Sequence, residues 1–225
     1  MKPTLILSTL SFLLFTLTIH FPLSFTQDIS VKDTDGDPLV PGTKYYIFPT
    51  TPGREGGGGL RVGLTTGQKC PITVIQDFSV NFRCLPVKFN VKDGEKTILE
   101  DYSKIDIEFD TKPECAHSSK WVLVENLKYR TAWISIGSIE DVKASNANVI
   151  DGVFYIKNQW IGYKFVYMLV YWSPALGGFS VINSYDDIDG RRLVIVNPKG
   201  HPEEENYRSY GVKFIKASGN GRSVA

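Results

Sequence analysis

Short runs of β-forming residues recur along almost the whole chain, and they limit the fold more than any other feature. The runs are rich in β-branched and aromatic residues, several alternate apolar with polar positions, and Gly, Pro, Asp or Asn separates them. Twelve runs lie at 44–48, 60–64, 72–76, 85–89, 104–109, 120–125, 131–136, 152–157, 163–172, 179–185, 191–197 and 211–217.

The same sequence lacks a helical pattern. No window longer than about ten residues repeats its apolar positions every 3.6 residues. Twelve strands joined by short connections predict a closed or capped all-β architecture, in which each strand edge has a partner. No low-complexity linker divides the chain: we expect the glycine-rich stretch 53–59 to be a mobile loop and the polar stretch 201–209 to precede the last strand.

The N-terminus has the layout of a secretory signal peptide, predicted to span residues 1–26. One lysine precedes an apolar run at 5–19, and Ser24 and Thr26 stand at positions −3 and −1 of a cut before Gln27. Interspersed serines, threonines and a proline make the apolar run shorter than a comfortable membrane span. The sequence therefore predicts export.

Residues 27–225 are expected to form one domain, because about 200 residues suit a single all-β unit. Lys and Arg number 25 and Asp and Glu 24, and the predicted signal peptide removes one lysine and no acid. A net charge near zero disfavours nucleic acid as a partner. No later segment approaches about 18 consecutive apolar residues, so we expect no membrane anchor in the mature form.

The three cysteines are Cys70, Cys84 and Cys115. In an exported protein two of them should pair, and spacing alone does not say which. A Cys70–Cys115 bridge would join residues 45 positions apart and stabilise the fold by about 4 kcal/mol in the chain-entropy model. Cys84 would then be either a small buried residue or a thiol able to bridge to another chain.

The sequence contains no recognisable catalytic or cofactor site. The predicted mature chain has only His117 and His201, and no G-x-S-x-G elbow accompanies them. His117 and Cys115 lack the second pair of ligands that structural zinc needs. The glycine run leads into a strand without a G-K-[ST] motif. We therefore expect no enzyme activity, metal or cofactor, and favour a binding module.

An ordered series of motifs runs through the predicted mature chain. The segment VKDTDGDPLVPGTKYYI (31–47) carries Val31, Asp33, Gly36, Leu39, Tyr45 and Ile47. Further motifs are GGGGLRVG (56–63), CPITVIQD (70–77), LPVKF (85–89), CAHSSKW (115–121), FYIK (154–157), YKFVY (163–167) and DGRRLVI (189–195). In this order they resemble the plant Kunitz family, of the soybean trypsin inhibitor type.

The resemblance implies a β-trefoil of twelve strands in three pseudo-equivalent units, with a six-stranded barrel and a cap of three hairpins. It also implies inhibition of serine endopeptidases by a monomer that is secreted or reaches the vacuole. Two cysteine positions of that pattern, Cys70 and Cys115, imply the disulfide. The inhibitory loop would join the fourth and fifth strands, at about residues 90–99.

Within this reactive-site loop, Lys96 is the predicted anchor in the primary pocket of a trypsin-like protease, and Thr97 would follow the scissile bond. A lysine there would form a charge-assisted contact with the acidic pocket floor. Glu95 and Ile98 flank the pair. Lys92 is the second choice, because an Asp-Gly sequence after it indicates a flexible turn.

Three features depart from the family pattern. Pro41 occupies the position of an asparagine that braces the loop, no cysteine occurs in 168–180 for a second disulfide, and Cys84 is additional. Two hypotheses therefore remain. One is a trypsin-type inhibitor that acts through Lys96, and the other is a member that serves in storage or ligand binding, or inhibits another protease class through a different loop.

Overall fold

The computed structural model of the protein contains all twelve predicted strands. It describes residues 29–51, 56–64, 68–79, 84–91, 94–126, 131–143, 147–159, 165–195 and 207–217. Two three-residue strands, β8 and β13, and one five-residue helix, α3, are additional. The elements are β1 (Lys44–Pro49), β2 (Leu60–Gly63), β3 (Thr73–Gln76), β4 (Val87–Val91), β5 (Ile105–Phe109), β6 (Trp121–Asn126), β7 (Thr131–Ile136), α3 (Ile139–Lys143), β8 (Asn148–Ile150), β9 (Val153–Asn158), β10 (Tyr167–Ser173), β11 (Gly178–Asp187), β12 (Gly190–Ile195), β13 (Tyr207–Ser209) and β14 (Gly211–Lys216).

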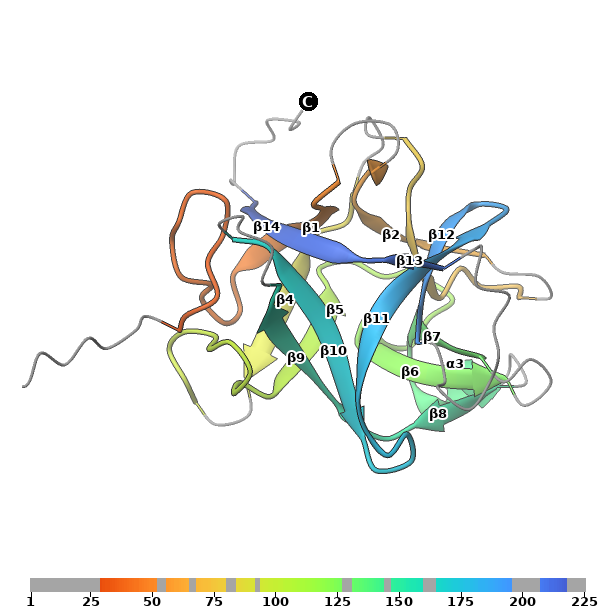
Figure 1. The fold of residues 1–225 in the computed structure, drawn as a ribbon. Helices are drawn as coiled ribbons and strands as arrows, with labels where there is room; N and C mark the ends of the chain where they lie inside the picture. The colour runs from red at the N-terminus through yellow and green to blue at the C-terminus, as the bar shows by residue number, and fades with distance from the viewer. Residues whose placement is uncertain are drawn as a thin grey trace, which may run out of the picture.

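Six strands close into a barrel, visible at the left of Figure 1. Its antiparallel pairs run β1–β4, β4–β5, β5–β9, β9–β10, β10–β14 and β14–β1, which completes the ring. Every barrel strand therefore has a partner on both sides, as predicted from the need to avoid open edges.

Three hairpins cap the barrel: β2–β3, β6–β7 and β11–β12. The strands β3, β7 and β12 also pair with one another, so the hairpins form a triangular array. β11 connects the two layers, because its first half pairs with barrel strand β10 and its second half with β12. The prediction of a β-trefoil is confirmed.

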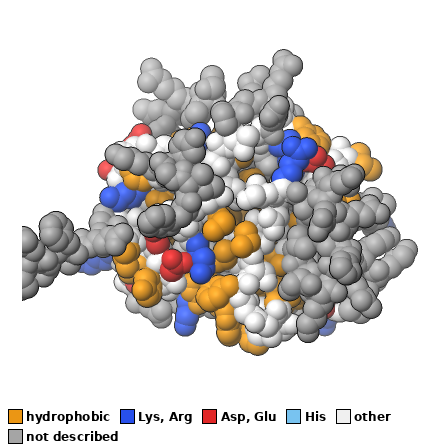
Figure 2. Space-filling model, in the orientation of Figure 1, with side chains coloured by type: hydrophobic (Ala, Val, Ile, Leu, Met, Phe, Trp, Pro, Cys, Tyr) orange, Lys and Arg blue, Asp and Glu red, His pale blue; other side chains and the backbone are white. Residues whose placement is uncertain are grey.

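The outer surface of the barrel differs from one side to the other. On β4 and β5, outward positions carry paired polar groups such as Asn90 and Glu108. On β10 and β11, Trp172, Phe179 and Val181 are exposed, and Figure 2 shows hydrophobic side chains gathered over these strands. Trp172 and Phe179 lie directly opposite each other across the hairpin.

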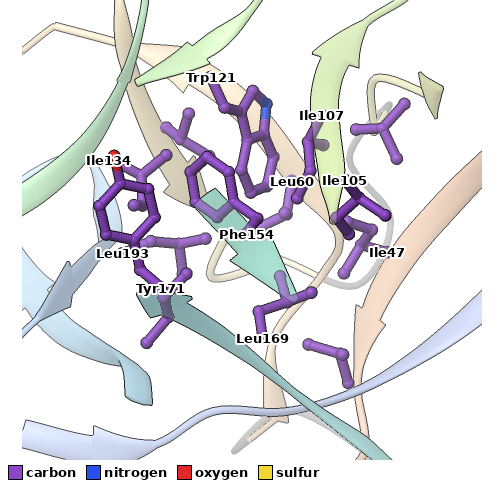
Figure 3. Packing of buried hydrophobic residues seen from close by; sticks show 14 of the residues in the cluster. Ile47, Leu60, Ile105, Ile107, Trp121, Ile134, Phe154, Leu169, Tyr171 and Leu193 are labelled. Atoms are coloured by element: carbon purple, nitrogen blue, oxygen red, sulfur yellow. The ribbon is translucent and has the colours of Figure 1, made fainter. Parts of the chain in front are cut away.

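Inward positions fill the barrel with aromatic and branched side chains (Figure 3). Along β5, Ile105 and Ile107 are fully buried while Asp106 between them is partly exposed. The ring of Phe154 lies 6.2 Å from that of Trp121 and 4.8 Å from that of Tyr171, edge-on in both cases. Each such side chain contributes about 1.5–3 kcal/mol by leaving water.

One predicted feature of the connections is wrong. Residues 56–59, expected to belong to a mobile loop, are buried. The carbonyl of Gly56 accepts a hydrogen bond from Arg191 Nη1 at 2.9 Å, and a β-carbon added at Gly58 would lie 2.3 Å from the carbonyl oxygen of Ser79. The glycines therefore serve close packing rather than mobility.

Among the described residues, none of the helices has the length and apolar character needed to cross a bilayer. The predicted signal peptide lies outside the described residues.

Candidate functional site

The connection between β4 and β5 carries the predicted reactive-site loop. Gly94 is exposed and has a φ of 70°, a left-handed conformation that glycine adopts without strain. Lys96 follows it and is also exposed, and Thr97 is half-buried. Among the described residues, no carboxylate forms an ion pair with the Lys96 ammonium. Lys92, the second choice, lies outside the described residues.

Ile98, predicted to flank the Lys96–Thr97 pair, has its side chain fully buried in the main core. Its N–H donates to the carbonyl of Leu39 at 3.1 Å, and its carbonyl accepts from Val31 N at 2.8 Å. Its side chain therefore packs inside the fold and is not available to a protease. Ile98 anchors the loop instead.

Glu95 also faces the protein rather than solvent alone. Its Oε2 accepts a hydrogen bond from the hydroxyl of Ser103, and the same hydroxyl accepts one from Leu99 N at 2.8 Å. Of the four predicted loop residues that the structure describes, Lys96 is therefore the one whose side chain is exposed, and Thr97 is partly accessible beside it.

An N-terminal segment, residues 29–39, holds one side of the loop. Ser30 and Leu99 form an isolated antiparallel bridge, and Glu100 N donates to the carbonyl of Ile29 at 2.8 Å. The segment is itself shaped by buried Asp33, whose Oδ1 accepts two backbone hydrogen bonds in the sequence Asp-Thr-Asp-Gly-Asp. That turn signature was readable from the sequence, whereas its contact with the loop was not.

The other side of the loop rests on β9. Asp101, with a φ of 64°, donates its N–H to the carbonyl of Ile156 at 2.9 Å, and its carboxylate lies 3.3 Å from Lys157 Nζ. The side chain of Glu100 accepts from Asn158 Nδ2 at 3.2 Å. Backbone contacts on two sides thus restrict the residues that follow Lys96.

Pro41, which replaces the bracing asparagine of the family pattern, is a turn residue. Thr43 N donates to the carbonyl of Val40 at 3.2 Å, and Gly42 has a φ of 76°. This Pro-Gly arrangement is typical of a type II turn. Pro41 has no side-chain donor with which to brace the loop.

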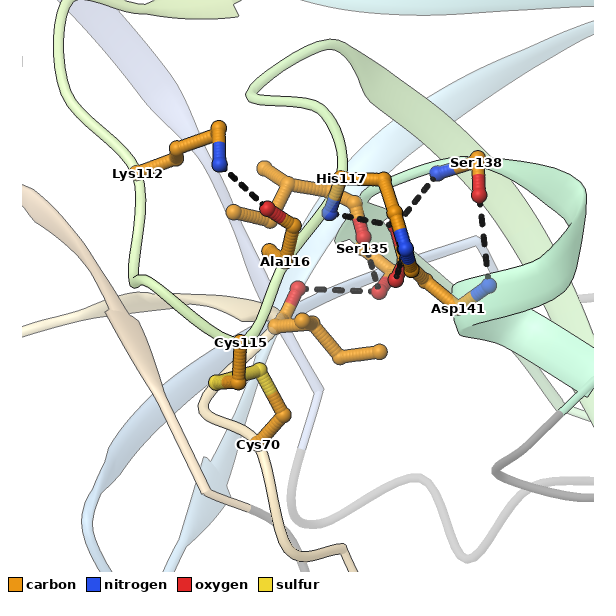
Figure 4. The surroundings of a disulfide bond; sticks show 10 residues. Cys70, Lys112, Cys115, Ala116, His117, Ser135, Ser138 and Asp141 are labelled. Atoms are coloured by element: carbon orange, nitrogen blue, oxygen red, sulfur yellow. Dashed lines mark hydrogen bonds and ion pairs between the residues drawn. A yellow bond between two sulfur atoms is a disulfide. The ribbon is translucent and has the colours of Figure 1, made fainter.

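Cys70 and Cys115 form a disulfide with a Cα–Cα distance of 5.9 Å (Figure 4). The loop after Cys115 is held further by Lys112 Nζ, which donates to the carbonyl of Ala116, and by His117 Nδ1, which lies 2.6 Å from Asp141 Oδ1. Because Cys115 is oxidised, it cannot pair with His117 as a metal ligand. Among the described residues, no group of three His, Cys, Asp or Glu side chains could hold a metal ion.

Asp141 also caps the short helix α3. Its Oδ2 accepts from Ser138 N at 2.8 Å, and Ser138 Oγ accepts from Asp141 N at 3.3 Å, which is a capping box. Burial would raise the pKa of Asp141, but the hydrogen bonds from Ser138 and His117 outweigh it and lower the pKa.

Cys84, the additional cysteine, is half-buried beside the glycine stretch. A β-carbon added at Gly59 would lie 2.4 Å from Cys84 Sγ. Burial raises the pKa of the thiol, so little reactive thiolate forms at neutral pH. This environment is that of a small packed residue rather than a bridging thiol.

Known proteins resemble this chain over most of its length. The legume Kunitz family model, described as trypsin and protease inhibitor, matches residues 31–210. A Kunitz-type trypsin inhibitor-like 1 protein of Pisum sativum is 35% identical over 219 residues, or 94% of this chain and 93% of that protein. The subtilisin inhibitor CLSI-II of Canavalia lineata is 34% identical over 188 residues, covering 84% and 92%. The crystal structure of a Kunitz-type trypsin inhibitor from Cicer arietinum superposes with a TM-score of 0.70 at 37% identity, covering 84% of this chain and 99% of that one.

Proposed function

The chain belongs to the Kunitz family of plant protease inhibitors, and from that premise we propose that it is a secreted inhibitor of a trypsin-like serine endopeptidase. The family consists of inhibitors rather than enzymes. Relatives named as trypsin and subtilisin inhibitors support a serine endopeptidase as the partner. The signal-peptide pattern of residues 1–26 supports secretion, to the cell exterior or the vacuole.

Lys96 is the proposed anchor, and one observation carries this choice. Its side chain is exposed while the backbone close after it, at Ile98 and Leu99, is bonded to the N-terminal segment. A loop that is ordered before binding loses little entropy when it docks, so more of the contact energy appears as affinity. The lysine ammonium then meets the acidic floor of the primary pocket.

The buried side chain of Ile98 sets the extent of the contact. In this proposal a protease contacts the segment Gly94, Glu95, Lys96 and Thr97, while the side chain of Ile98 stays inside the protein. A tight complex through so short a segment needs additional contacts from neighbouring loops to reach the usual interface of about 1,600 Å² in total.

Substitution of Lys96 tests the proposal. We expect Lys96→Ala, in the chain 27–225, to raise the inhibition constant for trypsin at least about 100-fold, since anchor residues dominate such interfaces. Lys104→Ala is the matched control, because Lys104 is an exposed lysine of the same connection. An inhibition constant that Lys96→Ala leaves unchanged would refute Lys96 as the anchor.

A second candidate function is inhibition of another protease class through a different loop. The burial of Ile98 favours it, because a substrate-like loop normally offers extended backbone on both sides of the scissile bond. Timed incubation with trypsin and with papain, a cysteine protease, followed by mass measurement, separates the candidates. An intact complex with papain alone supports the second, and rapid nicking by trypsin between residues 90 and 99 indicates a non-inhibitory member.

A further inference from the structure

Ser103 lies inside the β4–β5 connection, two positions before β5 begins, and is 1% exposed. Its hydroxyl makes two hydrogen bonds: it donates to Oε2 of Glu95 and accepts from the N–H of Leu99 at 2.8 Å. Its own N–H donates to the carbonyl of Leu99 at 3.2 Å. One buried side chain therefore contacts the connection at two points.

These two points lie on opposite sides of Lys96. Glu95 immediately precedes Lys96, and Leu99 follows it by three residues. A single oxygen atom thus ties the side chain before the exposed lysine to the backbone after it. Among the described residues, the contacts of the N-terminal segment with this loop are on the later side, through Ile98, Leu99 and Glu100.

We propose that Ser103 is a positioning residue that braces the Lys96 segment from within, the task for which Pro41 has no side-chain donor. This inference rests on the proposed function, in which Lys96 enters the protease pocket. A brace restricts Lys96 and Thr97 before binding, which favours tight association. It also keeps the cleaved ends together and slows net hydrolysis of the Lys96–Thr97 bond.

The chemistry of a hydroxyl suits this position, because it donates one hydrogen bond and accepts others at the same time. Alanine would remove both contacts and leave the Leu99 N–H without its acceptor inside the protein. Threonine would keep the oxygen. Glu95→Ala would remove only the contact before Lys96, at a half-buried position where the fold is less sensitive.

The test compares Ser103→Ala, Ser103→Thr and Glu95→Ala in the chain 27–225. We expect Ser103→Ala to raise the inhibition constant for trypsin about 10-fold and to accelerate cleavage after Lys96 about 10-fold, with a smaller change of the same sign for Glu95→Ala. Ser103→Thr should restore both quantities to within about three-fold of the parent chain. The rate of hydrogen exchange at residues 94–99 should be highest in Ser103→Ala, intermediate in Glu95→Ala and close to that of the parent chain in Ser103→Thr.

Ser135→Ala is the matched control. Ser135 is also 1% exposed, and its hydroxyl donates to the carbonyl of Ile72 at 2.8 Å in the cap. It should lower the unfolding temperature without changing inhibition, cleavage or exchange at 94–99. If Ser103→Ala only lowers the unfolding temperature as Ser135→Ala does, Ser103 is merely structural and the inference is wrong.

Failure of the proposed function gives a different pattern. In that case Lys96→Ala leaves inhibition unchanged, and so do the Ser103 variants. Hydrogen exchange still tests whether Ser103 braces the Lys96 segment. Faster exchange at residues 94–99 in Ser103→Ala than in Ser135→Ala supports that role, and equal exchange overturns it. Should Ser103→Ala fail to fold, Glu95→Ala and Ser103→Thr supply the same comparison.

Discussion

At position 58 an added β-carbon would meet backbone, not a movable side chain. It would lie 2.3 Å from the carbonyl oxygen of Ser79, whereas an added β-carbon at Gly177 would have no heavy atom within 4 Å. The two glycines therefore serve different purposes. Gly58 permits close approach of two chain segments, and Gly177 provides only a φ of 78°.

We expect Gly58→Ala to lower the free energy of unfolding by at least about 2 kcal/mol, because overpacking must displace backbone. Gly177→Ala should cost about 1 kcal/mol, from backbone strain alone. Urea unfolding of both variants measures the difference. If both variants lose the same free energy of unfolding, residues 56–59 can shift to make room for the added methyl group, as a mobile loop would.

At the scale of elements, the hairpin β10–β11 shows how the fold tolerates a missing disulfide. No cysteine occurs in 168–180, the region where the family pattern places its second disulfide. The ring of Phe179 instead packs edge-on against Tyr155 at 5.3 Å, with Lys157 Nζ 4.5 Å from its centroid. Ser173 Oγ donates to the carbonyl of Asp151 at 2.6 Å and secures the start of the turn.

Phe179→Ala should therefore lower the free energy of unfolding by about 1–2 kcal/mol although the side chain is 54% exposed, since it loses a cross-strand pair, a ring contact and a cation–π contact. Ile188→Ala is the control: that side chain is 86% exposed and its truncation should stay within about 0.5 kcal/mol. Thermal unfolding compares the two. If Phe179→Ala and Ile188→Ala unfold at the same temperature, the Phe179 contacts do not stabilise the hairpin.

Elements were predictable from sequence where alternation decided them, as in β5, and not where distant contacts did. β10 begins at Tyr167, because Phe165 adopts a left-handed φ of 62° that a strand does not accommodate, while the predicted start at 163 lies outside the described residues. β8 and β13 have three residues each, too few for a pattern. In the loop, the exposure of Lys96 was predictable because a charged side chain favours water. The burial of Ile98 was not, because it depends on backbone contacts with Val31 and Leu39, which lie far from it in the sequence.

For the whole molecule, two carboxylates link loops to the fold. Hydrogen bonds from Lys44 and Lys88, at 2.7 and 2.8 Å, hold the pKa of Asp110 below its ordinary value, and the pKa of Asp141 is lowered as well. A carboxyl with a lowered pKa in the folded state stabilises that state above the pKa of the unfolded chain. The stabilisation is lost as the pH falls through the folded-state pKa.

We therefore expect the unfolding temperature to change little through these groups between about pH 7 and 5, and to fall below about pH 4. Asp141→Asn should unfold at a lower temperature at pH 7 and lose less of its stability between pH 4 and 2 than the parent chain. Scanning calorimetry at several pH values measures both. If the unfolding temperature falls equally in the variant and the parent chain between pH 4 and 2, Asp141 does not contribute to the loss of stability in acid.

The ring of six strands has a consequence for biosynthesis. β1, near the start of the described chain, is bordered on one side by β14, near its end. Until the ribosome has released that last strand, one border of β1 stays vacant and the barrel cannot shut. During that interval the unpaired border of β1 offers backbone N–H and C=O groups to which another nascent chain could pair.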